Sequence, residues 1–422
     1  MQAGDVEIMA PVGSYESLMA AIQGGADSVY FGIGHLNMRS KSSKNFTIDD
    51  LQKIVEITKQ HGVRTYITIN TVIYDSELED MKELVRAAKK YGVTAIIAAD
   101  MSVINYAKSQ GVEIHISTQC NVTNIEAIKF YSQFADVVVT ARELNLNQVA
   151  AITETIRKEN ITGPSGKQIQ IEMFAHGALC MAVSGKCYLS LDNMNSSANR
   201  GACLQPCRRK YDVKDKDSEI ELEVDNEYIM SPKDLKTVHF LNKILDAGVK
   251  VLKIEGRGRS PEYVKKVTQT YKKAVEAYFE NDYTKEKIEE FNTDLNSVYN
   301  RGYWNGYYLG QRLGEWTEKY GSQATQKKIF VGNVTNFFSK LNVVELKTET
   351  VNNLSVGDKI YIMGSTTGVY EDVVKEIRVD LIPVEQTKKG DLCSFRVNQT
   401  IRRGDKVFKI IKANKKEIDF QS

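Results

Sequence analysis

The chain of 422 residues lacks the features that would place it in or across a membrane, and it has little net charge. No stretch of about 18 residues is apolar and free of charge, so we expect no transmembrane helix. The first residues do not combine a basic segment with an apolar core, so we expect no secretory leader. The formal net charge of +2 gives no argument for a nucleic-acid partner. We therefore expect a cytoplasmic protein, in which thiols stay reduced.

Cysteine is scarce, yet four of the six cysteines lie close together in the sequence. They follow the spacing C-x6-C-x15-C-x3-C and are Cys180, Cys187, Cys203 and Cys207. Because disulfides are rare in a reducing compartment, this clustering indicates a metal site. The first spacing is loose for a zinc knuckle, and the radical SAM spacing C-x3-C-x2-C is absent, so zinc, an iron–sulfur cluster and inert buried thiols all stay open. We interpret Cys120 and Cys393 as structural.

A recurrent pattern dominates the first 260 residues: an amphipathic stretch, a glycine and a short apolar run, as in "HGVRTYITIN" and "YGVTAIIAAD". The glycine is typical of a left-handed helix C-cap, and the run after it is typical of a buried parallel strand. The predicted strands are 7–12, 28–33, 64–69, 95–99, 113–117, 137–141, 168–174 and 251–256. Eight strands alternating with helices predict an α/β fold, a (β/α)8 TIM-like barrel. The G-x-G-x-x-G turn of a dinucleotide-binding fold is missing after the first strand.

A cysteine-rich insertion at about 175–250 interrupts the predicted barrel between strands 7 and 8. It leaves the C-terminal end of a barrel strand, which is the face where barrel active sites lie. With a helical extension expected at 260–320, residues 1–320 form the predicted barrel domain. Residues 326–422 alternate in the manner of strands with Gly-Asp turns, and they predict a second domain, a small all-β barrel.

The second predicted domain is locally basic, with 17 Lys and Arg residues against 12 Asp and Glu residues. The excess is concentrated in "QTIRRGDKVFKIIKANKK". An RNA-binding patch and a solvated strand face with lysines that protect a sheet edge are equally good interpretations. Arg402 and Arg403 are the candidate RNA contacts of this segment.

Longer motifs resemble a known family. The stretch "EMFAHGALCMAVSGKCYLS", residues 172–190, resembles the signature of the U32 "collagenase-like" peptidase family, which combines E-x-F, G-[SA]-aliphatic-C and G-x-C. The stretches "NRGACLQPCRRKY", "APVGSYESLMAAIQGGADSVYFG" and "LKIEGRGRSPEYV" resemble the family as well. The resemblance covers essentially the whole chain, including the C-terminal segment.

The resemblance implies an activity and a cofactor. Better-understood members of the family are oxygen-independent hydroxylation proteins with a 4Fe–4S cluster, and one branch forms 5-hydroxyuridine at the tRNA wobble position with prephenate as hydroxyl donor. Other branches hydroxylate a cytidine of ribosomal RNA or serve ubiquinone synthesis. Length and domain order resemble the tRNA branch best. On this resemblance the four clustered cysteines are cluster ligands, and the expected partners are tRNA, a small dicarboxylate co-substrate and a paralogous family subunit.

The family name keeps a peptidase as an alternative. The chain has neither an H-E-x-x-H motif nor a G-x-S-x-G motif, and it contains only five histidines. His176 and Cys180 could form a dyad, but their spacing alone is weak evidence, and the resemblance assigns Cys180 to the cluster. A cluster-bearing RNA-binding subunit without catalytic activity is a third interpretation.

Polar side chains at predicted strand ends are the candidate substrate contacts. We expect Arg142 and Arg257 to hold the carboxylates of a dianionic donor, and Glu143 or Glu255 to move protons. For each, a structural salt bridge at a strand end is the alternative. The full set of catalytic candidates is Arg142, Glu143, Glu172, His176, Glu255 and Arg257, and further contacts are Asn70, Asp100 and Gln119.

Cations and aromatic residues near the cysteines are candidate RNA contacts. Arg208, Arg209 and Lys210 directly follow the last clustered cysteine, which suits RNA phosphates or the charge of a cluster, with a solvated surface run as the alternative. Arg301 and Trp304 are expected to offer stacking surface for unpaired bases, and helix packing is the competing explanation.

Overall fold

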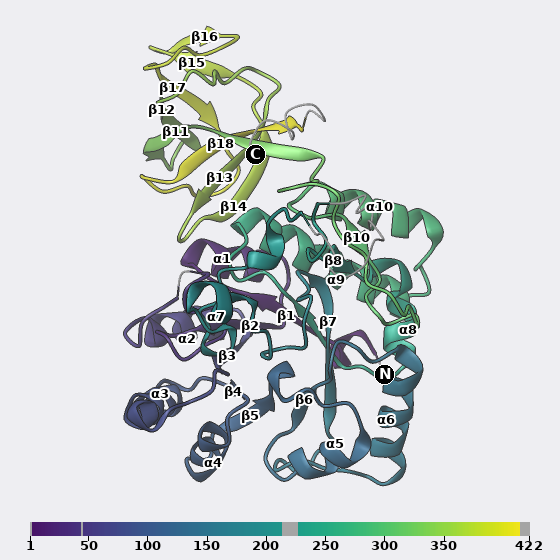
Figure 1. The fold of residues 1–422 in the computed structure, drawn as a ribbon. Coiled ribbons are helices and arrows are strands. Elements are labelled where there is room, and N and C mark those ends of the chain that lie inside the picture. Colours follow the sequence, from purple (N-terminus) through teal and green to yellow (C-terminus); the bar gives the residue numbers. More distant parts are fainter. Residues whose placement is uncertain (1, 44, 213–226, 414–422) are drawn as a thin grey trace.

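The structure, a computed structural model, describes residues 2–43, 45–212 and 227–413. Its larger part is a closed barrel of parallel strands (Figure 1). Each of the first seven strands pairs with the next one along the chain, and β9 closes the barrel by pairing with both β1 and β7. The barrel strands are β1 (Glu7–Pro11), β2 (Ser28–Gly32), β3 (Arg64–Ile69), β4 (Ala95–Ala98), β5 (Glu113–Ile116), β6 (Val137–Val139), β7 (Gln170–Gly177) and β9 (Val251–Ile254). The predicted (β/α)8 barrel is confirmed.

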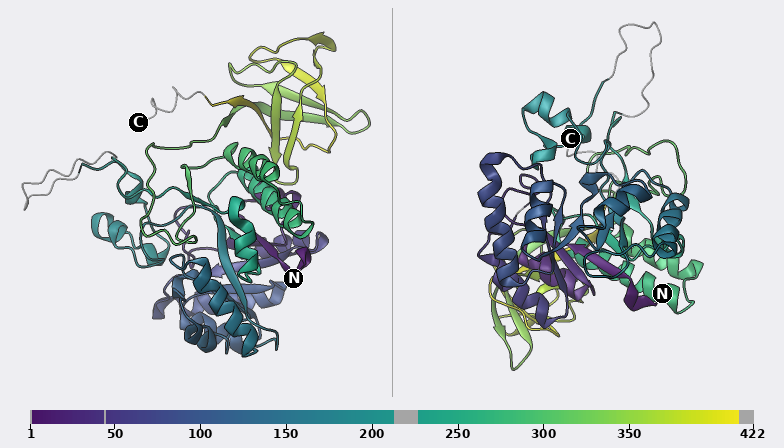
Figure 2. Two further views of the ribbon diagram at one scale, coloured as in Figure 1. Left: turned by 90° about the vertical axis from the view of Figure 1, so that its right-hand side faces the viewer. Right: turned by 90° about the horizontal axis from the view of Figure 1, so that it is seen from below.

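Helices cover the outside of the barrel (Figures 1 and 2). They are α1 (Tyr15–Gln23), α2 (Asp50–Gln60), α3 (Leu78–Tyr91), α4 (Met101–Ser109), α5 (Ile125–Tyr131), α6 (Leu146–Lys158), α8 (Leu241–Asp246) and α9 (Pro261–Phe279). In α3, Met81, Leu84 and Val85 are buried, with the three- and four-residue spacing of a helix face that packs on a sheet. The helix ends at Gly92, whose φ of +75° is left-handed, so glycine is needed for this C-cap.

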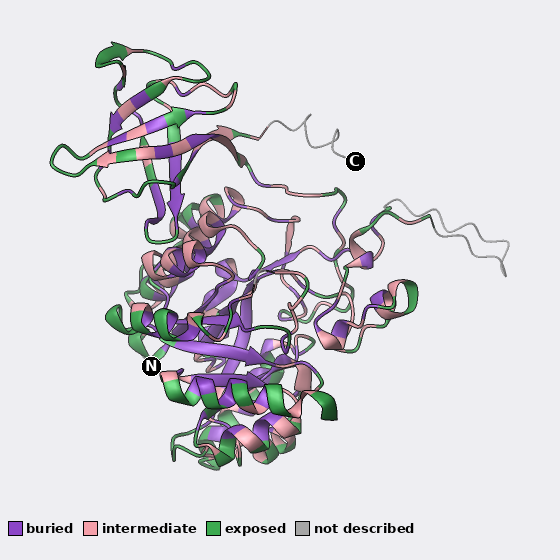
Figure 3. Cartoon of the chain, turned by 90° about the vertical axis from the view of Figure 1, so that its left-hand side faces the viewer, coloured by how far each residue is buried: buried purple, intermediate pink, exposed green. Residues whose placement is uncertain are grey.

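Apolar side chains fill both sides of the barrel wall, and the strands are buried almost throughout (Figure 3). Between strands and helices lies the main hydrophobic core. Inside the barrel, Met9, Tyr66 and Ile97 belong to a smaller cluster. The interior also holds buried charged side chains, including Glu172 and Lys253, which makes it unusual among packed cores.

The cysteine-rich insertion lies at the C-terminal ends of the barrel strands, because β7 continues beyond the barrel into it. It contains α7 (Leu189–Met194), which lies outside the barrel wall (Figure 2). The chain returns through β8 (Asp234–Lys236), which runs antiparallel to β7, and β10 (Tyr303–Trp304) then pairs with β8. Short 3-10 helices complete this part and the rest of the barrel at Ala3–Asp5, Asp75–Glu77, Thr118–Cys120, Ala198–Arg200, Pro206–Arg208 and Val238–Phe240.

The predicted helical extension contains α9 and α10 (Lys285–Asn296). Beyond Asn296 the chain is irregular up to the second sheet, apart from β10. The aromatic stretch "NRGYWNGYYLG" therefore forms loops against the insertion instead of continuing the helix. Among the residues described, none of the helices combines the length and apolar character that a membrane crossing requires.

The C-terminal part is a separate antiparallel sheet, which confirms the predicted all-β unit. Its strands pair in the order β14-β13-β18-β11-β12-β17-β15-β16 around one hydrophobic cluster. They are β11 (Gln326–Phe338), β12 (Val343–Thr348), β13 (Lys359–Gly364), β14 (Gly368–Val373), β15 (Ile377–Val379), β16 (Ile382–Val384), β17 (Leu392–Arg396) and β18 (Lys406–Lys412). The end of the predicted basic run, at 414–416, lies outside the described residues.

The second sheet rests on the barrel through the turn between β13 and β14 (Figure 1). The Gln23 side chain of α1 donates to the Thr367 carbonyl (2.8 Å) and accepts from the Val369 amide (2.9 Å). Lys265 of α9 donates to the Val369 carbonyl at 2.7 Å. Met363 and Val369 also belong to the main hydrophobic core, so the contact between the two parts is apolar as well as hydrogen-bonded.

Candidate functional site

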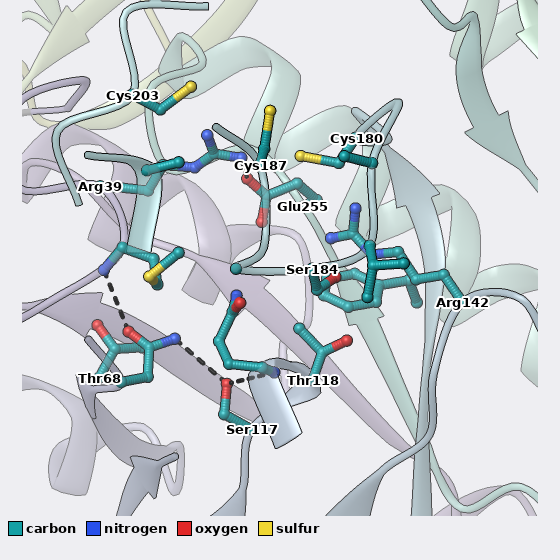
Figure 4. A pocket seen from close by; sticks show the side chains of 18 of the residues that line it. Arg39, Thr68, Ser117, Thr118, Arg142, Cys180, Ser184, Cys187, Cys203 and Glu255 are labelled. Atoms are coloured by element: carbon teal, nitrogen blue, oxygen red, sulfur yellow. Dashed lines mark hydrogen bonds and ion pairs between the residues drawn. The ribbon is translucent and has the colours of Figure 1, made fainter. Parts of the chain in front are cut away.

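A cavity opens at the C-terminal ends of the barrel strands, and we call it the mouth cavity (Figure 4). Its inner wall is formed by side chains of successive strands, and its outer wall is formed by the cysteine-rich insertion. The strand residues are Tyr30, Thr68, Ile97, Phe174 and Lys253. The cavity therefore occupies the place where (β/α)8 barrels hold their active sites.

All four clustered cysteines line the mouth cavity. Figure 4 shows the sulfur atoms of Cys180, Cys187 and Cys203 at the same end, opposite Ser117 and Thr118. Burial, together with the neighbouring thiols, raises the pKa of the Cys203 thiol. The same two causes raise the pKa of the Cys207 thiol to about 11.

The thiols share the cavity without closing on one point. Within the described ranges, no three Cys, His, Asp or Glu side chains lie close enough together to hold a single metal ion. Four thiols at one cavity are nevertheless a donor set that suits iron–sulfur clusters or zinc. The donor chemistry therefore fits the predicted cofactor, whereas the ligand geometry stays a prediction.

Positive side chains dominate the rest of the mouth cavity. Arg39, Arg142, Lys253 and Arg257 line it, and Glu255 is the one acidic residue among its described lining. Arg39 Nη2 lies 2.7 Å from Glu255 Oε1, and the Tyr30 hydroxyl donates to Oε2 at 3.0 Å. The sequence candidates Arg142, Glu255 and Arg257 are thus brought together.

Glu255 is ionised in this setting. Burial alone would raise the pKa of its carboxyl, but Arg39, Arg142 and Arg257 outweigh burial and lower the pKa to about 2. A carboxyl with this pKa accepts hydrogen bonds and balances charge, and it cannot act as a proton donor near neutral pH. A pKa this far below neutral also makes the carboxylate a weak base, so Glu255 is an anchor for Arg39 in the resting protein.

Arg257 is fixed by neutral partners. Its guanidinium donates to the Thr68 hydroxyl (3.0 Å) and to Asn37 Oδ1 (2.9 Å). Burial lowers its pKa to about 10, so it stays charged at neutral pH. Gly32 leaves room for this side chain, because a Cβ there would lie 2.5 Å from Arg257 Nη1.

Glu172 lies below the mouth cavity and acts on it through Lys253. Its carboxylate is completely buried and holds Lys253 Nζ at 2.6 Å, while His115 Nδ1 lies 4.0 Å from its other oxygen. Lys253 Nζ also lies 4.7 Å from the centre of the Tyr30 ring, a cation–π distance. Glu172 is therefore a positioning residue, and Lys253 is the group that lines the cavity.

Arg142 and Glu143 separate at the end of β6. The Arg142 guanidinium lies over the Phe174 ring, 4.1 Å from its centre, and its buried Nε–H has no acceptor. Glu143 is exposed and lines a neighbouring cavity instead of the mouth cavity. Arg142 lines both cavities, so the two residues share the neighbouring cavity but not the mouth cavity.

His176 is buried among tyrosines. The ring centres of Tyr263, Tyr271 and Tyr303 lie 6.0, 5.6 and 5.4 Å from that of His176. Burial first, and then Lys236 and Arg259, lower its pKa to about 3, so the imidazole is neutral. His176 is not among the described residues that line either cavity, which fits a packing role at the base of the insertion.

Two of the three further contacts lie at the mouth cavity. Asn70 Nδ2 donates to the Ser117 hydroxyl at 3.3 Å, and Gln119 lines the same wall. Asp100 instead caps α4 by accepting from the Ser102 amide at 2.9 Å. Asp100 is therefore a structural residue.

The candidate RNA contacts differ in availability. Arg208 is held inside the protein, where it donates to the carbonyls of Leu179 (2.7 Å) and Pro232 (2.6 Å). Arg209 is exposed, and Lys210 lies 2.9 Å from a Glu227 carboxylate oxygen.

The other four candidate RNA contacts also include both buried and exposed residues. Arg301 contacts Asp234 at 3.4 Å, and Trp304 is only 5% exposed. Arg402 and Arg403 are exposed on the second sheet.

Sequence reasoning missed Arg39 and Lys253. Lys253 stands two positions before Glu255 in a buried strand, so both side chains point to the same face. A lysine at such a position of an apolar strand is a signal that could have been used. Arg39 lies in an irregular segment between β2 and α2, where no periodic pattern marks it.

Comparison with known proteins places these observations in a family. Residues 13–318 match the family described as Peptidase family U32. A protein of Porphyromonas gingivalis named collagenase is 58% identical, over 98% of this chain and 99% of its own length. The "tRNA hydroxylation protein P1" of Bacillus subtilis is 35% identical over 64% of this chain and 63% of its own length. The "23S rRNA 5-hydroxycytidine C2501 synthase" of Escherichia coli is 34% identical over 65% and 40%.

Proposed function

Because the chain belongs to peptidase family U32, we propose that it is an iron–sulfur protein that hydroxylates a wobble uridine of tRNA, with prephenate as the hydroxyl donor. The observation that carries this proposal is the composition of the mouth cavity, where four thiols face four cations and one carboxylate. A hydrolase of peptides needs an activated nucleophile, whereas a redox transfer from a small dianion needs thiol-held iron and a cationic site.

Two arginines of the mouth cavity, Arg142 and Arg257, favour a ligand with two negative charges. Glu255 pairs with Arg39 and Glu172 pairs with Lys253, whereas no carboxylate in the described ranges lies within ion-pair distance of Arg142 or Arg257. Two guanidinium groups that lack counter-ions suit two carboxylates, because the planar fork binds each carboxylate through two hydrogen bonds. Prephenate is a dicarboxylate with one hydroxyl group, and it supplies both features.

The proposed transfer is balanced between the donor and the base. The C5–H bond of uridine and the C–O bond of the donor hydroxyl break, while a C5–O bond and a C–H bond on the donor form. The base thereby loses two electrons that the donor gains, and no dioxygen is consumed. Because the hydrogen lost from C5 is matched by the C–H bond formed on the donor, the exchange as a whole releases no proton.

The four clustered cysteines are proposed to hold the cluster. A cluster in this position would supply one-electron chemistry next to the substrates. Arg39 lies at the same end of the cavity as the labelled cysteines (Figure 4), where its charge would offset that of the thiolates. Arg208 secures the outer wall by linking the loops that carry Leu179 and Pro232.

The test combines metal analysis with nucleoside analysis. Anaerobically purified protein is expected to contain about four iron and four sulfide ions per chain, as a 4Fe–4S cluster requires. Cys187→Ala should lose both, whereas Cys393→Ala, a buried cysteine of the second sheet, should keep them. Transfer RNA from a deletion strain should lack 5-hydroxyuridine and regain it with the wild-type gene only. One zinc and no sulfide, or unchanged tRNA, would contradict the proposal.

A peptidase is the second candidate, because the relative named collagenase is 58% identical over nearly the whole chain. The cavities offer it little support, since no histidine is among the described residues that line the mouth cavity. Gelatin cleavage by the purified protein that survives Cys180→Ala and Cys187→Ala would favour the peptidase. Loss of all cleavage after one further purification step would assign such activity to a contaminant.

A further inference from the structure

A second cavity lies directly beside the mouth cavity and is walled by aromatic residues. We call it the aromatic chamber, and its rings come from Trp304, Tyr307, Tyr308 and Trp316. The chamber has a volume of about 220 Å³. Since one water takes roughly 30 Å³ of liquid volume, the chamber can hold a group of the size of a single ring.

The two cavities share a wall. Residues 180–183 line both of them, and so does Arg142. A group bound in the aromatic chamber therefore lies next to Cys180 and next to the site proposed for the donor. This neighbourhood makes the chamber suitable for the second substrate of a transfer reaction.

Buried donors in the chamber lack acceptors. Trp304 is 95% buried, because its exposed fraction is 5%, and its Nε1–H has no hydrogen-bond partner in the protein. The Nε–H of Arg142 is buried without a partner as well. Both groups can only donate, so a ligand that satisfies them must bring acceptor atoms. An unsatisfied buried donor costs about 1–3 kcal/mol, which a matching ligand would recover.

The acidic group of the chamber is the Glu143 carboxylate, which can only accept when ionised, whereas the Tyr308 hydroxyl already donates to the Phe174 carbonyl at 2.9 Å. Two donors and one acceptor match the edge of uracil, which presents the O2 and O4 acceptors on either side of the N3–H donor. Cytosine places an amino group where uracil has O4 and a bare N3 where uracil has N3–H, so it would set a donor against a donor and an acceptor against the Glu143 carboxylate. Aromatic walls suit either base face, because unpaired bases stack on aromatic side chains.

We propose that the aromatic chamber holds an unpaired uracil base that has been taken out of the RNA stack. This inference rests on the proposed function and names the site where its RNA substrate is read. Trp304 and Arg142 donate to the base carbonyls, Glu143 accepts from N3–H, and Tyr307 and Trp316 supply apolar contact. Enzymes that modify a base generally extrude it into a pocket of this kind.

The chain carries its own reporter for this proposal, because Trp304 and Trp316 are its only tryptophans. Both line the chamber, so tryptophan fluorescence reports its occupancy directly. The probes are three single-stranded RNA pentamers that differ only at the centre: uridine, cytidine or an abasic residue. Anisotropy of a terminal dye gives the affinity, and tryptophan emission gives occupancy of the chamber. The protein is used as purified anaerobically.

The uridine pentamer is expected to quench the tryptophan emission and to bind at least about tenfold tighter than the abasic pentamer, given the usual value of base stacking. It should also bind at least about tenfold tighter than the cytidine pentamer, because each of the two mismatched hydrogen bonds is worth roughly 1–3 kcal/mol. Trp304→Phe keeps the ring and removes the N–H, so the preference for uridine over cytidine should fall to about twofold or less. Trp316→Phe keeps Trp304 as the single reporter and should retain the preference.

Equal binding of the uridine and abasic pentamers without a change in emission would overturn the proposal, and so would an unchanged uridine preference in Trp304→Phe. Quenching by a gelatin peptide but not by the uridine pentamer would also overturn it. If cells gain 5-hydroxyuridine while the pentamers leave the emission unchanged, this inference fails and the proposed function stands. Uridine-selective quenching with unmodified tRNA supports the chamber and counts against the proposed function.

Discussion

The interior of the barrel and its mouth both hold charged side chains, but they balance these charges differently. In the interior, Glu172 and Lys253 neutralise each other across neighbouring strands at 2.6 Å. At the mouth, Arg142 and Arg257 have no carboxylate within ion-pair distance among the described residues. Burying a charge without a counter-ion costs several kcal/mol, so a surplus of this kind indicates a site for an anionic ligand. We expect the buried pair to support the fold, and we propose that the unpaired arginines at the mouth bind an anion.

The largest effect on stability should come from breaking the interior pair. Glu172→Ala leaves Lys253 without its counter-ion, and removing one partner of a buried pair typically costs about 3–5 kcal/mol of unfolding free energy. Glu143→Ala, at an exposed carboxylate, should change it by less than about 0.5 kcal/mol. Denaturant titration of both variants measures the difference. Equal midpoints would show that the interior charges do not support the fold.

At the mouth, a charge change should affect binding more than stability. Arg257→Met removes a cation that has no carboxylate within ion-pair distance among the described residues, so we expect the affinity for prephenate to fall roughly 100-fold, the scale of a lost buried charge contact. The unfolding free energy should fall by about 1–2 kcal/mol, because the Thr68 hydroxyl and Asn37 Oδ1 lose their hydrogen-bond donor. Calorimetric titration and denaturant unfolding give the two numbers. Arg257→Lys keeps the charge without the fork and should bind with intermediate affinity. If Arg257→Met lost stability but kept its affinity for prephenate, Arg257 would support the fold and not the binding of the donor.

His176 is a titratable group that is buried in its neutral form. Its pKa is lowered from 6.5 to about 3, first by burial and then by Lys236 and Arg259. The unfolded chain binds a proton near pH 6.5 and the folded chain does not, so stability falls as the pH drops below about 6.5. For one such group the loss is at most about 1.4 kcal/mol per pH unit.

The measurement is denaturant unfolding at pH 7.0, 6.0 and 5.0. His176→Phe should show a flatter decline over this range than the wild type. The pKa of His239 is also lowered by burial, so His239→Phe is the matched control and should flatten the decline less. Parallel curves for the wild type and His176→Phe would mean that the imidazole binds its proton equally well in the folded and unfolded chains.

A further difference in stability is expected between two adjacent arginines of the insertion. Arg208 donates to the carbonyls of Leu179 and Pro232, so Arg208→Ala should lower stability by about 1.5–3 kcal/mol, the range for hydrogen bonds from charged groups. Arg209 is exposed, so Arg209→Ala should stay within about 0.5 kcal/mol. Thermal unfolding of both variants is the measurement. A reversed order would mean that the insertion is not held by Arg208.

The barrel could be predicted because its signals are local. Each glycine cap with its apolar run, as at Gly92 before β4, specifies one helix end and one strand within a few residues. The family motif placed the four thiols at the end of β7, and the structure brings them to one cavity. Arg142, Glu255 and Arg257 were predictable because strand ends are where barrel sites lie.

The remainder of the site depends on contacts between distant segments. Arg39 reaches Glu255 across 216 positions of the chain, and no sequence period marks such a contact. From the sequence, Trp304 was expected to be exposed and to stack on unpaired bases. In the structure it is buried, because β10 pairs with β8. Lys253 lies on the inward face of β9, a position that the strand pattern could have indicated. Its partner Glu172 becomes clear only from the register between β7 and β9. Side-chain burial in irregular segments is set by tertiary packing and is not encoded in local patterns.

The measurement that tests the account most directly follows the hydroxyl oxygen. Prephenate labelled with ¹⁸O at its hydroxyl group is incubated under anaerobic conditions with the purified protein and unmodified tRNA, and the nucleosides are analysed by mass spectrometry. We predict 5-hydroxyuridine that carries the ¹⁸O label, and none with Arg257→Met at the same donor concentration. Unlabelled 5-hydroxyuridine, or no modified uridine while the cluster is intact, would contradict the account.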